Sequence, residues 1–138
     1  MFSAGSPLLW WDGFGWAFAL TCVIEVPAYL LAFRVLGWWG PVGPLAGRTA
    51  FGLTVAVNLI THPVLWAVSH QLDGVGQLMA AELGVAVTEA GLIAVVVGRA
   101  SGPGDRRTRL AWSLLTAVAV NAASVLVGAL ILPVLTSR

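Results

Sequence analysis

Long apolar stretches alternate with short polar or Gly/Pro-rich links along this chain. A stretch of about 20 apolar residues can cross the ~30 Å hydrocarbon core of a bilayer as a helix. Four such stretches are present, near residues 16–36, 51–69, 77–98 and 110–133. The pattern predicts an all-α integral membrane protein, a four-helix antiparallel bundle in which residues 1–138 form a single transmembrane domain.

The composition agrees with a membrane protein and excludes several other classes. Hydrophobic residues make up 59% of the chain and charged residues 9%, and the mean hydropathy is +0.92. A net charge of +1 gives no reason to expect nucleic acid as a partner, so the expected partner is the lipid bilayer. The single cysteine, Cys22, excludes a disulfide within the chain. The first 15 residues carry no Lys or Arg, and a cleaved signal peptide is not expected.

The arginines predict the orientation in the membrane. Six of the seven lie at the links after the first and third apolar stretches: Arg34, Arg48, Arg99, Arg106, Arg107 and Arg109. The seventh is Arg138 at the C-terminus. Because cytoplasmic links carry the excess of basic residues, we expect a multi-pass protein of the cell membrane with both Arg-rich turns in the cytoplasm and both termini outside.

A polar pattern occurs twice within the apolar stretches. Glu25 is followed after 33 residues by Asn58, and Glu89 is followed after 32 residues by Asn121. The residues around the asparagines also match, with Thr61 and Ser124 in equivalent positions. This pattern predicts a tandem repeat of two helical hairpins, although chance similarity among abundant Ala and Val is an alternative. Sites in such repeat folds often lie near the membrane midplane, between the repeats.

Ionisable residues inside a membrane are costly and are functional candidates by default. The predicted site consists of His62, Glu82 and Glu89 around one outward-opening cavity, with Glu25, Asn58 and Asn121 at its floor. His62 and Glu82 have no polar counterpart in the other repeat. Thr61, Ser124 and Pro63 are supporting residues, since Pro63 lacks an N–H and leaves the Leu59 carbonyl without its helical donor. The whole set is His62, Glu82, Glu89, Glu25, Asn58, Asn121, Thr61, Ser124 and Pro63.

These residue types suit a cation. A histidine with two carboxylates can hold a divalent metal ion, for which His62, Glu82 and Glu89 are the candidate ligands, so a divalent metal is a candidate cofactor. Two carboxylates at one depth repel each other, so we expect at least one of Glu25 and Glu89 to be protonated at neutral pH unless such an ion binds.

Three functions remain open from the sequence. The first is binding or conduction of a proton, metal ion or small cationic solute, and four helices are so few for a pathway that this favours a homo-oligomer or a larger membrane complex. The second is a structural or accessory subunit whose polar residues join helices. The third is an intramembrane Glu/His hydrolase with Glu89 or Glu82 as general base. No H-E-x-x-H, G-x-S-x-G, P-loop or C-x-x-C motif is present, and an enzyme is the least favoured of the three.

Overall fold

The structure is a computed structural model that describes the backbone of residues 7–136 and the side chains of residues 14–127 and 130. Its four helices are α1 (Pro7–Val35), α2 (Gly47–Ser69), α3 (Val75–Ser101) and α4 (Arg106–Thr136). Each is long and apolar enough to cross a membrane. The prediction of an all-helical, multi-pass membrane protein is therefore confirmed. Arg138, which entered the predicted orientation, lies outside the described residues.

All four helices begin earlier than the apolar pattern predicts, with α2 at Gly47 instead of near residue 51 and α3 at Val75 instead of near residue 77. The first starts at Pro7 instead of near residue 16, and the fourth starts at Arg106 instead of near residue 110. Proline is favoured at the first helical position, where no N–H is needed. Before α4, Asp105 accepts hydrogen bonds from the Arg107 N–H and from the Thr108 hydroxyl. At α1 and α4, residues that favour a helix start thus allow the helix to extend beyond its apolar segment.

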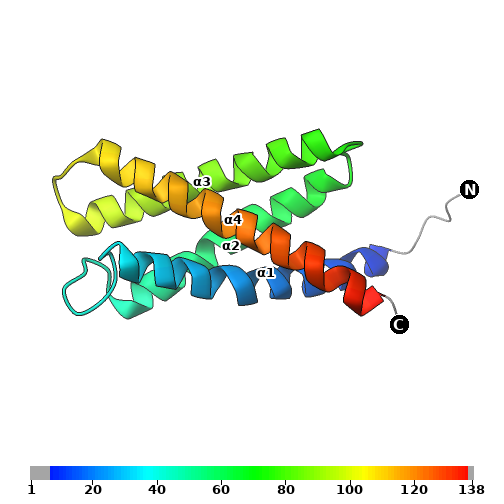
Figure 1. Ribbon diagram of the computed structural model, residues 1–138, viewed down its shortest axis with the longest axis horizontal. Helices are drawn as coiled ribbons and strands as arrows, with labels where there is room; N and C mark the ends of the chain where they lie inside the picture. Colours follow the sequence, from blue (N-terminus) through cyan, green and yellow to red (C-terminus); the bar gives the residue numbers. More distant parts are fainter. Residues whose placement is uncertain (1–6, 137–138) are drawn as a thin grey trace, which may run out of the picture.

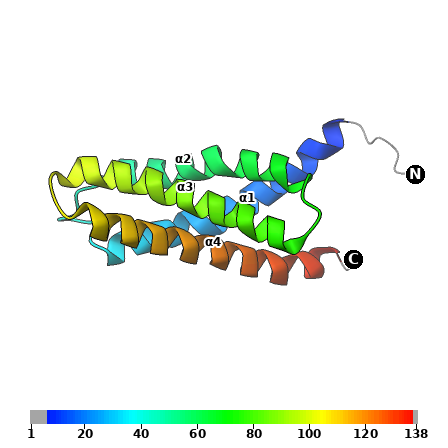
Figure 2. The same cartoon turned by 90° about the horizontal axis from the view of Figure 1, so that it is seen from above.

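The helices lie side by side, and each packs against two others. Helix α1 contacts α2 and α4, and α3 contacts the same two helices. Figures 1 and 2 show that the α1–α2 and α3–α4 turns lie together at one end of the molecule. The α2–α3 turn lies at the opposite end, near the first turns of α1 and the last turns of α4. Every helix therefore has one side facing the interior of the group.

Apolar side chains occupy the interior and also cover the outside. The buried core includes Tyr29, Phe33, Val57, Ile93 and Val97. Large apolar side chains on the outside include Leu31, Leu59, Leu83 and Leu115. In a bilayer these outer side chains contact lipid, and polar side chains must find their hydrogen bonds inside the protein. Among the side chains that the structure describes, the buried polar ones are Glu25, Thr54, Asn58, Thr61, Glu89, Ser113, Thr116 and Asn121.

The α1–α2 turn folds back onto the end of α1. Gly37 has a φ of +71°, a conformation that glycine adopts without strain, and it ends the helix. The N–H groups of Trp38 and Trp39 both donate to the Phe33 carbonyl. Leu45, which is 2% exposed, packs into the core from this turn. The turn thus closes one end of the interior.

Candidate functional site

Glu89 on α3 lies at the centre of the polar interior and is fully buried. Its Oε2 atom accepts hydrogen bonds from the Tyr29 hydroxyl of α1 at 2.5 Å and from the Asn121 amide of α4 at 2.7 Å. Its Oε1 atom lies 2.8 Å from the Thr61 hydroxyl of α2. One carboxyl group therefore joins all four helices, which satisfies the requirement that buried polar groups be paired.

The Asn121 amide has a single orientation that fits its surroundings. Its two N–H groups point to Glu89 Oε2 at 2.7 Å and to the Ala117 carbonyl at 2.9 Å. Turning the amide over would direct its oxygen at two acceptors, so the neighbouring atoms determine the assignment. Asn121 Oδ1 is buried and has no hydrogen-bond partner.

The Thr61 hydroxyl can form a hydrogen bond with Glu89 whether the Glu89 carboxyl is ionised or protonated. It lies 2.8 Å from Glu89 Oε1 and 2.8 Å from the Val57 carbonyl oxygen. The hydroxyl has one hydrogen and can donate it to only one of these atoms. If Thr61 donates to Val57, the hydrogen between Thr61 and Glu89 must come from Glu89. The same heavy-atom positions thus accommodate Glu89 with or without a proton.

Glu25 on α1 is the second buried carboxyl group, and its surroundings differ. It is 1% exposed, and its Oε2 atom has no hydrogen-bond partner. The nearest basic group is His62 on α2, with Nε2 at 3.5 Å from Glu25 Oε2. This distance exceeds the ~2.7–2.9 Å of a charge-assisted hydrogen bond. His62 Nε2 is likewise buried without a hydrogen-bond partner. The His62 ring lies edge-on to Phe18, with ring centroids 6.4 Å apart.

Glu25, His62 and Glu89 form one cluster. A ligand atom from each of the three lies within 4.8 Å of the others, so the group could hold a metal ion. The sequence predicted His62, Glu82 and Glu89 as ligands, and the structure places Glu25 rather than Glu82 in this group. The three residues come from three different helices.

Glu82 lies instead in an open cavity of about 470 Å³ toward the α2–α3 turn. The lining residues include His62, Glu82, Thr21 and Ser69. Glu89 does not line this cavity, because its carboxyl group lies deeper in the bundle. His62 is 12% exposed and belongs to both the cavity and the buried cluster. It is therefore the connection between them.

The remaining predicted residues take less central positions. The Asn58 amide donates to the Thr54 carbonyl of its own helix at 3.0 Å, and its buried Oδ1 has no partner. Ser124 is partly exposed, and Pro63 is exposed on the surface of α2. Sequence reasoning missed Tyr29, which contributes the shortest hydrogen bond to Glu89. A signal was available, because Tyr29 is the only tyrosine in the chain and lies within an apolar helix.

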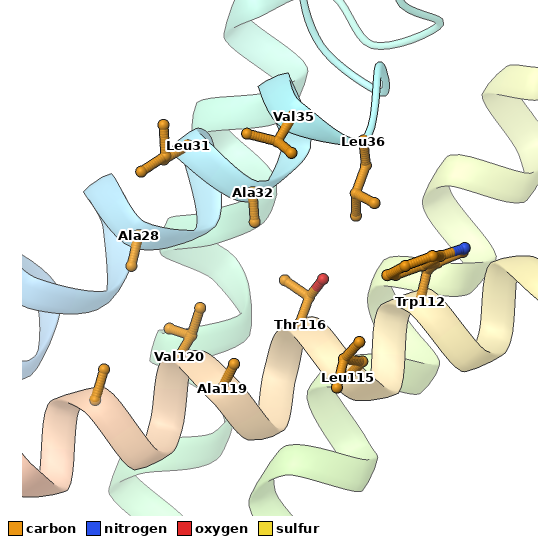
Figure 3. A pocket seen from close by; sticks show the side chains of 11 residues that line it. Ala28, Leu31, Ala32, Val35, Leu36, Trp112, Leu115, Thr116, Ala119 and Val120 are labelled. Atoms are coloured by element: carbon orange, nitrogen blue, oxygen red, sulfur yellow. The ribbon is translucent and has the colours of Figure 1, made fainter.

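The opposite half of the molecule has a cavity of different character. It has a volume of about 440 Å³ and lies between α1 and α4 near the α1–α2 and α3–α4 turns. Figure 3 shows side chains such as Ala28, Leu36, Trp112 and Leu115 converging on it. None of its lining residues is ionisable. This cavity therefore lacks the ionisable groups that line the His62–Glu82 cavity.

The chain matches no known protein-family model, and no curated protein or solved structure is significantly similar to it. A function for this protein therefore has to be inferred from the geometry of its polar interior.

Proposed function

We propose that this multi-pass membrane protein binds a small cation, whether a proton, a metal ion or a small cationic solute, at the Glu25–His62–Glu89 cluster. The observation that carries the proposal is the buried Glu25 carboxyl, whose Oε2 has no hydrogen-bond partner and faces His62 Nε2 at 3.5 Å. A buried carboxylate is costly unless a positive charge or a proton compensates it. The cavity lined by His62 and Glu82 gives a cation its route to the cluster.

The proposed architecture is an antiparallel bundle built from two repeated hairpins in one domain. The spacing of buried residues supports the repeat. Four buried residues of α1 each have a buried counterpart 64 positions later in α3: Glu25 and Glu89, Val26 and Ala90, Tyr29 and Ile93, Phe33 and Val97. Five buried residues of α2 likewise have a buried counterpart 63 positions later in α4: Ala50 and Ser113, Leu53 and Thr116, Thr54 and Ala117, Val57 and Val120, Asn58 and Asn121. Equivalent residues therefore face the interior in both halves.

In the proposed orientation the Arg-rich turns are cytoplasmic, and the His62–Glu82 cavity opens to the outside. Conduction across the membrane would require more than four helices can enclose, so the working unit is a homo-oligomer or a larger membrane complex. Cysteines introduced into the α3–α4 turn should react with an impermeant reagent only after intact cells are permeabilised. Labelling without permeabilisation would contradict this orientation.

Cation-dependent thermal unfolding tests the function. Protons, metal ions and small cationic solutes are supplied in turn to purified wild type in detergent. The one that binds should raise the unfolding temperature, because ligands that bind only the folded state stabilise it. The seven tryptophans provide the fluorescence signal. Glu25→Gln should abolish this response. Asp73→Asn is the matched control, since it removes a carboxylate from the exposed α2–α3 turn and should leave the response intact. An equal response in Glu25→Gln would refute the proposed site.

The accessory-subunit function is the second candidate, and the network around Glu89 favours it. Hydrogen bonds from Tyr29, Thr61 and Asn121 to one carboxyl are what helix-joining polar residues would make. This candidate predicts co-purification with a larger partner and no effect of His62→Ala except on assembly. Within the hydrolase alternative, Glu89 has less support as the general base than Glu82, because Glu89 is fully buried and lies outside the lining of the cavity that Glu82 shares with His62.

A further inference from the structure

We propose that the cation is a first-row divalent transition-metal ion such as Zn²⁺, held by Glu25, His62 and Glu89. This inference rests on the proposed function and names the class of ion that the same cluster takes. An imidazole nitrogen with carboxylate oxygens is a ligand set typical of Zn²⁺ and its neighbours. Ca²⁺ would need six to eight oxygen ligands, and this cluster offers a nitrogen and two carboxyl groups.

The separation of the ligand atoms fits a shared ion better than a hydrogen bond. With metal–ligand bonds of about 2.0–2.1 Å, two ligands of a tetrahedral ion lie roughly 3.3–3.4 Å apart. Glu25 Oε2 and His62 Nε2 are 3.5 Å apart, and both atoms are buried without hydrogen-bond partners. The third ligand atom, from Glu89, lies within 4.8 Å of the other two. Small side-chain adjustments bring all three to bonding distance.

Charge balance points to a divalent ion. Two carboxylates and a neutral imidazole carry a total charge of −2, which a divalent cation neutralises. The arginines that the structure describes are too far from the cluster to neutralise this charge, because they lie at the helix ends: Arg34, Arg48, Arg99, Arg106, Arg107 and Arg109. The chain contains no lysine. Within a low-dielectric interior, a neutral complex avoids the large cost of an uncompensated charge.

The neighbours of Glu89 are arranged as outer-shell partners. Carboxylates that bind metals are themselves held by hydrogen bonds, which orient them and are important for affinity. Tyr29, Thr61 and Asn121 surround Glu89 in this way from three helices. Three protein ligands also leave a coordination position for water or another group. Glu82, in the cavity beside His62, places a further carboxyl along the route of an incoming cation.

Zinc binding to the full chain in detergent tests the inference directly. Metal-free wild type is dialysed against Zn²⁺, and the bound metal is measured by mass spectrometry. We expect about one tightly bound ion per chain, as for a preformed site. Glu25→Gln and His62→Gln should each weaken binding by more than about 100-fold, beyond the loss typical of an outer-shell partner. Tyr29→Phe should weaken it by about 10- to 100-fold.

The controls separate this site from adventitious binding. His70→Gln removes the other histidine, at the end of α2, and should bind Zn²⁺ like wild type. Glu25→Gln and His62→Gln replace atoms that make no hydrogen bonds, so both variants should fold, as checked by circular dichroism and gel filtration. Visible spectra of the Co²⁺-loaded protein should lose their metal–ligand bands in His62→Gln.

The possible failures are distinguishable. Equal Zn²⁺ affinity in wild type and His62→Gln would overturn the metal site. If wild type binds no divalent metal, but protons or monovalent cations stabilise it through Glu25, the metal inference fails and the proposed function stands. If no cation stabilises wild type, both fail.

Discussion

The two buried glutamates are equivalent in the proposed repeat, yet their surroundings differ. Glu89 accepts hydrogen bonds from side chains of the other three helices. Glu25 has an oxygen with no such partner, and His62 lies 3.5 Å from it. The extent of burial does not explain why the two glutamates have different partners, because Glu25 is 1% exposed and Glu89 is 0% exposed.

Two positions at which the halves of the proposed repeat differ contribute to this difference. Tyr29 donates to Glu89, and the residue 64 positions later is Ile93, which cannot donate. Thr61 is buried against Glu89, while Ser124 is partly exposed. The comparison teaches that the Glu89 carboxyl is held in place by side chains of the other helices, whereas Glu25 has an oxygen that no hydrogen bond occupies.

Replacing each glutamate by leucine should produce the largest contrast. Glu89→Leu removes three interhelical hydrogen bonds, each worth about 0.6–1.7 kcal/mol in membranes, and should destabilise the protein by about 2–5 kcal/mol. Glu25→Leu removes a poorly paired buried carboxyl and should leave the free energy of unfolding unchanged or higher in metal-free detergent. Titration with SDS, followed by circular dichroism, measures both. Equal destabilisation would end the distinction between the two glutamates.

The two asparagines should show the same contrast at a smaller scale. Asn121→Ala breaks the 2.7 Å bond to Glu89 and should lower the free energy of unfolding by about 1–2 kcal/mol. Asn58 donates only within its own helix, so Asn58→Ala should cost less than about half of that. The same SDS titration compares them. A larger loss for Asn58→Ala would mean that its amide pairs across helices.

The hydroxyl pair sharpens the comparison further. Thr61→Val keeps the shape of the side chain and removes the donor to Glu89, with an expected loss of about 0.6 kcal/mol. Ser124→Ala, at the equivalent position of α4, should be close to neutral. Thermal unfolding in one detergent at one pH is sufficient to rank the two. The ranking would be reversed if Ser124 had the more important contact.

The starts of α4 and α2 should give the smallest difference in stability, and this difference depends on pH. Asp105 precedes α4, where hydrogen bonds from Thr108, and then from the Arg107 N–H, lower the pKa of its exposed carboxyl. Helix α2, its counterpart in the proposed repeat, begins after Ala46, whose side chain makes no capping hydrogen bond. A pKa lower in the folded than in the unfolded state stabilises the fold above about pH 4, and this stabilisation is lost as pH falls through the folded pKa.

Melting temperatures of wild type and Asp105→Ala test this cap. Wild type should be the more stable near neutral pH, and the two curves should approach each other below about pH 4. A constant difference across the acid range would show that the carboxylate charge is not what stabilises the start of α4.

The sequence by itself determined the class of the protein, the number of spans and the burial of the polar residues. Apolar stretches of about 20 residues have few alternatives to a membrane helix. Polar side chains in such helices have to turn inward, and Glu25, Asn58, Glu89 and Asn121 are all buried. These conclusions need only the length and hydropathy of each segment.

Only the tertiary structure decided which polar groups meet. Tyr29 and Glu89 are 60 residues apart, and their contact depends on how α1 and α3 are rotated about their axes. Glu82 shares a cavity with His62 but lies outside the cluster, and the spacing of residues along each helix does not show which carboxyl comes closest to His62. Glu25 lies in the cluster because helix packing, set by many apolar contacts at once, orients it there.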